Sequence, residues 1–95
     1  MYWFMIAAKP KPGTEVRDGV IGSFVSCWID FQLQDGAELL ARHYIEEAGW
    51  TVESVEDVLY TELSYYEDKP ELPYFLEAET DGTCLVFHTY SNDDE

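Results

Sequence analysis

The segment DGAELLARHYIEEAG, residues 35 to 49, gives the clearest secondary-structure signal in the chain and sets the order of the elements around it. Small and apolar side chains recur in it at three- and four-residue spacing: Ala37, Leu40, Ala41, Tyr44, Ile45 and Ala48. This spacing predicts an amphipathic helix over residues 36 to 48. Asp35 and Glu38 fit an N-cap and a capping box, and Gly49 fits the left-handed residue that ends a helix.

Strand-forming segments lie on both sides of this helix. Four segments have the required aromatic and β-branched content: residues 2–8, 20–31, 50–63 and 83–90. A helix between the second and third of them predicts a right-handed crossover, which makes those two strands parallel. A second helix is expected over residues 72–80, with Pro73 in its first turn. The sequence therefore predicts an α+β fold of order β-β-α-β-α-β, a plait-like two-layer sandwich with a four-stranded mixed sheet and both helices on one face.

The length and composition fit one folded unit. Ninety-five residues with 46% hydrophobic and 16% aromatic content predict a single acidic α/β domain over residues 1–95. Three segments of it are expected to lie outside the core, namely an N-terminal loop over 9–19, an acidic tyrosine-rich loop over 64–71 and a polar tail over 91–95.

The charge narrows the classes of partner. Twenty Asp and Glu against five Lys and Arg give a net charge of −15, which disfavours nucleic acid and anionic membranes and attracts a basic protein. The simpler alternative is that the acidity only keeps the protein in solution. No run approaches the ~20 apolar residues of a membrane span, and the two cysteines form no CxxC motif, so we expect a cytoplasmic protein.

The predicted helix raises the question of a histidine site. His43 stands four residues before Glu47, a spacing that lets the two side chains meet, and Glu38 has the same relation to Arg42. His43 falls outside the apolar stripe, so both pairs are expected to be exposed ion pairs of small energy rather than a metal or acid-base site.

The sharpest enzymatic hypothesis uses three residues. Cys84 and His88 lie four apart in the last predicted strand and therefore share a face. With Cys27 beside them they would form a thiol-histidine cluster, as in a small thiol- or metal-dependent enzyme or a metal-binding protein. Because single cysteines usually behave as small buried apolar residues, we predict no catalytic residue, no metal and no cofactor.

The acidic loop is the best candidate for a functional surface. Its candidate partner-binding residues are Tyr65, Tyr66, Glu67, Asp68, Glu71 and Tyr74. Tyrosine gives a large contact area with a polar tip, which suits recognition of a basic protein. The alternative is that these rings fold back over the edge of the core.

A second candidate surface is the sheet face that the helices leave uncovered. Phe24 and Trp28 are expected there, where solvent, the N-terminal loop or a homodimer would cover them. The leading functional hypothesis is a small non-enzymatic interaction or regulatory protein, in its sharper form an inhibitor or immunity-type protein that blocks a basic partner.

Overall fold

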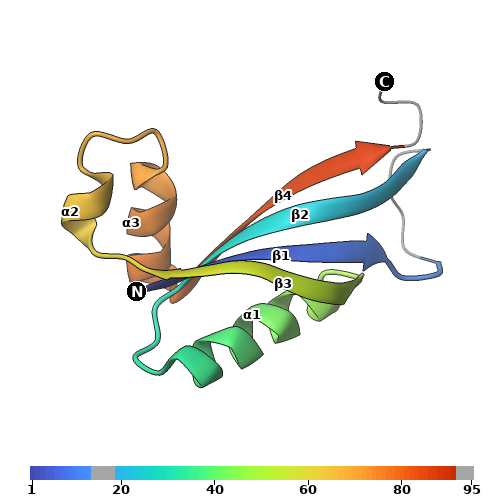
Figure 1. Cartoon of the computed structure of the whole chain (residues 1–95), viewed down its shortest axis with the longest axis horizontal. Coiled ribbons are helices and arrows are strands. Elements are labelled where there is room, and N and C mark those ends of the chain that lie inside the picture. Colours follow the sequence, from blue (N-terminus) through green and yellow to red (C-terminus); the bar gives the residue numbers. More distant parts are fainter. Residues whose placement is uncertain (14–18, 92–95) are drawn as a thin grey trace.

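The computed structural model describes residues 1–13 and 19–91 and confirms the predicted α+β class and four-stranded sheet (Figure 1). The strands of the described part are β1 (Tyr2–Pro10), β2 (Val20–Ile29), β3 (Trp50–Tyr60) and β4 (Thr83–Ser91). Its helices are α1 (Gln34–Glu47), α2 (Leu63–Tyr66) and α3 (Leu72–Asp81). Most of the predicted tail and residues 14–18 of the predicted N-terminal loop lie outside the described residues.

The strand order is β3-β1-β2-β4, and every pair of neighbouring strands is antiparallel. The predicted mixed sheet is therefore corrected. β2 and β3 do run in the same direction, as the crossover predicts, but β1 lies between them and pairs with both. β1 takes this central place because it is almost wholly apolar, whereas the acidic β3 stands at an edge, where charges discourage pairing with other chains.

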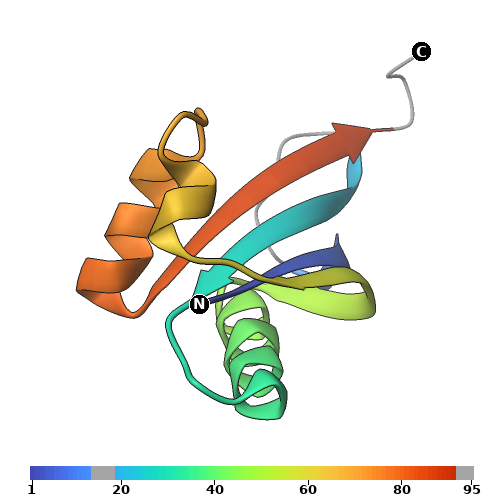
Figure 2. The same ribbon diagram turned by 60° about the vertical axis from the view of Figure 1, so that its left-hand side comes forward.

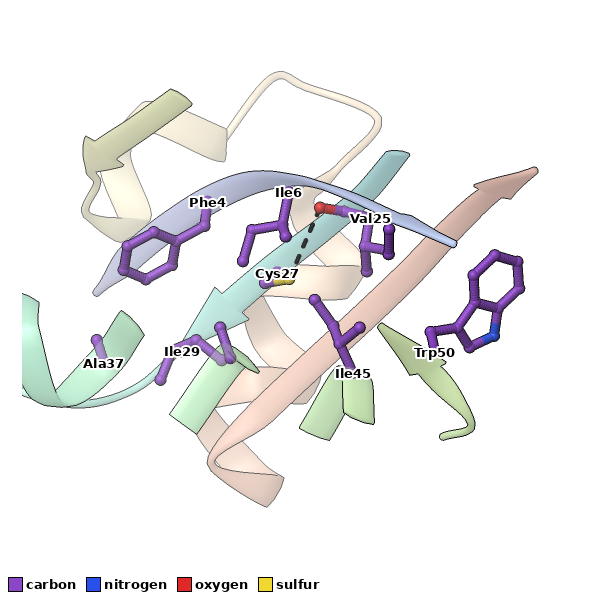
Figure 3. Close-up of a cluster of buried hydrophobic side chains, with 10 residues drawn as sticks. Phe4, Ile6, Val25, Cys27, Ile29, Ala37, Ile45 and Trp50 are labelled. Carbon is purple, nitrogen blue, oxygen red and sulfur yellow. Dashed lines mark hydrogen bonds between the residues drawn. The ribbon is translucent and has the colours of Figure 1, made fainter. Parts of the chain in front are cut away.

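The helices cover opposite faces of the sheet, which corrects the prediction that both lie on one face (Figure 2). α1 packs against the face that carries Phe4, Ile6 and Cys27, and this core is shown in Figure 3. α3 packs against the other face, around Trp28 and Cys84. The reason is that alternate residues of β2 place large apolar side chains on both faces, so each face needs a cover.

The helix ends differ in detail from the sequence pattern. The N-cap of α1 is Leu33, with no side-chain cap hydrogen bond, so the predicted N-cap at Asp35 is wrong. Asp35 lies in the first turn, where a negative charge is still favourable. Pro73 does stand in the first turn of α3, and the predicted loop over 64–71 includes most of the short helix α2.

Candidate functional site

A groove of about 380 Å³ opens on the α3 side of the sheet, next to α2. Its floor comes from all four strands and consists of Trp3, Met5, Ser26, Trp28, Leu59 and His88. Its wall comes from α2 and the turn that follows, and consists of Tyr65, Tyr66, Lys69 and Glu71. The volume falls in the range of small-ligand and side-chain pockets.

The register of the sheet builds the floor. Trp3 of β1 lies opposite Trp28 of β2 on one side and opposite Leu59 of β3 on the other. One row further along, Met5 lies opposite Ser26. Directly opposed residues of antiparallel strands project from the same face of a sheet. These five side chains therefore all project into the groove beside α2.

Tyr66 attaches the wall to the floor. Its side chain is only 4% exposed, and its hydroxyl accepts a hydrogen bond of 3.0 Å from the indole Nε1 of Trp28. Its ring also packs on Phe75 of α3, with 5.1 Å between the ring centroids. Tyr66 therefore belongs to the core of this face, as the alternative for the tyrosines of this loop expected.

Tyr65 behaves differently from its neighbour. It is 46% exposed, and the ammonium Nζ of Lys69 lies 4.2 Å from the centroid of its ring. Lys69 Nζ also donates a hydrogen bond of 3.0 Å to the backbone oxygen of Tyr65. The face of the Tyr65 ring therefore already binds a cation from within the chain, the Lys69 ammonium.

The acidic residues of the predicted surface remain available. Glu67 and Asp68 are exposed, and Glu71 is half-buried at the groove. None of the three forms an ion pair within residues 1–13 and 19–91, where the ion pairs lie on β1, β3 and α1. Tyr74 is partly exposed beside them, with its ring 5.2 Å from that of Trp28.

The two predicted outer-face residues, Phe24 and Trp28, both lie on the sheet face opposite α1, but only Phe24 is exposed to solvent. Trp28 is 3% exposed beneath α3, and Phe24 is 42% exposed, with its ring 5.5 Å from that of Tyr90. A homodimer through this face would therefore contact Phe24 and not Trp28.

The thiol-histidine cluster is not assembled. Cys27 lies in the core beneath α1 and Cys84 in the core beneath α3, on opposite faces of the sheet. His88 is exposed and shares the face of Cys84, about 13 Å away along the strand at 3.3 Å per residue. No group of three or more His, Cys, Asp or Glu in the described part of the chain is placed to hold a metal ion.

Both thiols are also poor nucleophiles. Burial raises the pKa of Cys27 to about 12, and the nearby Cys84 adds to this rise. Burial likewise raises the pKa of Cys84 to about 12, with a further contribution from the Glu77 carboxylate. Since the thiolate is the reactive form, neither side chain is activated in the folded protein.

Comparisons with protein families, curated proteins and solved structures find no match to this chain. The functional interpretation therefore depends on the groove and on the charge around it. None of the helices described is long and apolar enough to cross a membrane.

The sequence indicated Tyr65, Tyr66, Glu71 and Trp28 of the groove but missed the rest of it. The alternation in β1, which places Trp3 and Met5 opposite to Phe4 and Ile6, was a usable signal. Alternation also placed Ser26 on the face of Trp28, and His88 on the face of Cys84, but that these residues and Leu59 meet in one groove follows from the pairing register of distant strands.

Proposed function

We propose that the chain is a small non-enzymatic interaction or regulatory protein of the cytoplasm that binds a basic protein partner. The binding surface is the acidic α2–α3 surface, which we define as Tyr65, Glu67, Asp68, Glu71 and Tyr74. In the sharper form of the proposal, the chain is an inhibitor or immunity-type protein that blocks the basic surface of its target.

The observation that carries the proposal is that the carboxylates of this surface form no ion pair within the described residues, although one cation, Lys69, stands in the same turn. These carboxylates are Glu67, Asp68 and Glu71, and the whole chain has a net charge of −15. Two partly exposed tyrosines flank these carboxylates. Such a surface steers and holds a positively charged protein, and the steering weakens as salt screens the charges.

The test is capture of proteins from a cell lysate by the tagged chain, with parallel washes at low and high salt and identification of the retained proteins by mass spectrometry. We expect a basic protein that is retained at low salt and released at high salt. If nothing specific is retained at either salt, the acidity serves solubility alone and the proposal fails.

A matched pair of variants assigns the binding to the surface. In E67Q/D68N/E71Q we expect capture of the basic protein to fall at least tenfold, because Glu67 and Asp68 are exposed charges that contribute about 0.5 kcal/mol each and the half-buried Glu71 contributes more. The control D35N/E46Q/E47Q neutralises one Asp and two Glu on α1, across the sheet, and should capture as well as the wild type. Equal losses in the two variants would show that only net charge matters.

A further inference from the structure

Ser26 places a hydroxyl without a protein partner in the floor of the groove. The residue is 5% exposed and lines the groove between Met5 and Trp28. Thr83 Oγ1 is the one fully buried side-chain oxygen without a partner among the described residues, so the unbonded Ser26 Oγ is open to the groove. A serine oxygen can accept a hydrogen bond from a donor that enters there.

The aromatic lining favours a cation. Trp3, Trp28 and Tyr65 line the groove, and because Trp28 is only 3% exposed, the accessible rings are those of Trp3 and Tyr65. Aromatic faces attract cations. The molecule itself demonstrates this at Tyr65, which holds the ammonium of Lys69 against its ring.

The charges around the groove also select a cation. The carboxylate of Glu71 lines it, and Asp57 lies opposite Met5 on the same face. Glu67 and Asp68 stand in the turn that forms its wall. Glu71 and Lys69 are the permanently charged residues of the lining within the described part of the chain, and Asp57, Glu67 and Asp68 add three negative charges around it, so an anionic ligand would be repelled.

We infer that the groove receives an arginine side chain of the basic partner. The aliphatic stem contacts Met5 and Leu59, and the guanidinium stacks on the aromatic lining while it donates to Ser26 Oγ and to the Glu71 carboxylate. Arginine suits this lining better than lysine because its planar group carries five donors, is weakly hydrated and stacks on rings. This inference rests on the proposed function, since it names the chemistry by which the partner engages the surface.

Removal of the Lys69 charge distinguishes a cationic from an anionic occupant of the groove. Its ammonium repels an incoming guanidinium, so Lys69→Met should strengthen binding of arginine about fivefold, as expected for one like charge removed at the edge of the groove. An anionic occupant would instead bind more weakly to this variant.

The experiment is a titration of the full chain, at low salt, with an unstructured Gly-Ser peptide that carries several arginines and with its lysine counterpart, followed by tryptophan fluorescence. We expect the arginine peptide to bind about fivefold more tightly. Ser26→Ala and Glu71→Gln should each weaken arginine binding about tenfold through loss of a hydrogen bond to a charged group. Glu46→Gln, which removes the same charge on α1, should leave binding close to that of the wild type.

The outcomes separate this inference from the proposed function. If the two peptides bind equally and Ser26→Ala and Glu71→Gln match Glu46→Gln, the groove does not receive arginine, although the surface can still hold a basic partner. Absence of arginine binding, weaker binding in Lys69→Met, or a dimer in sedimentation that the arginine peptide does not dissociate would each overturn the inference. The capture experiment decides the proposed function independently, and far-UV circular dichroism confirms that each variant is folded.

Discussion

Trp28→Ala is expected to lower the free energy of unfolding by about 3–5 kcal/mol, as for other large buried aromatic residues. The side chain is 3% exposed and fills the space between the sheet and α3. Its loss also leaves the hydroxyl of Tyr66 without the 3.0 Å bond from the indole. Urea denaturation followed by far-UV circular dichroism measures the change.

Phe24→Ala is the matched control for this prediction. Phe24 lies on the same strand and the same face but is 42% exposed, so its removal should cost about 1 kcal/mol or less. If the two substitutions cost the same, α2 and α3 do not pack on this face, and the groove beside them is not formed as described.

Both thiols are expected to react with a thiol reagent at pH 8 about a thousandfold more slowly in the folded chain than in the denatured chain. The reason is ionisation, because a rise in pKa from 9.0 to about 12 lowers the thiolate fraction at this pH by about three orders of magnitude. Burial of both residues slows the reaction further. Single Cys27→Ala and Cys84→Ala variants assign the rate of each thiol.

The same pKa shifts predict the direction of a pH effect on stability. A thiol whose pKa is higher in the folded chain keeps its proton more tightly there, so its contribution to stability is full below pH 9 and declines as the pH rises towards 12. A thiol that reacts in the folded chain as fast as in urea would contradict the assignment and would restore thiol chemistry as a candidate activity.

The elements of the fold were predictable from local patterns. The apolar stripe of residues 36–48 located α1, and alternation with aromatic content located the four strands to within a few residues. Their arrangement was less predictable. A crossover fixes the direction of two strands but not which strand lies between them, and β1 occupies that place.

The candidate site was predictable only in its charges and tyrosines. Glu67 and Asp68 follow from composition, and Tyr65 from its position beside them. That Tyr66 turns inward and Tyr65 outward depends on the short helix α2, which four residues of sequence do not specify. Alternation places Ser26 on the face of Phe24 and Trp28, but a serine in a strand gives no sign of which residues of the neighbouring strands lie beside it.

The binding constant for the captured basic partner, measured over a range of salt concentrations, tests most directly whether the acidic α2–α3 surface drives recognition. We predict an affinity that falls steeply with salt in the wild type and in D35N/E46Q/E47Q, and a weaker affinity with a smaller salt dependence in E67Q/D68N/E71Q. An affinity that does not change with salt, or that the two triple variants alter equally, would contradict this function.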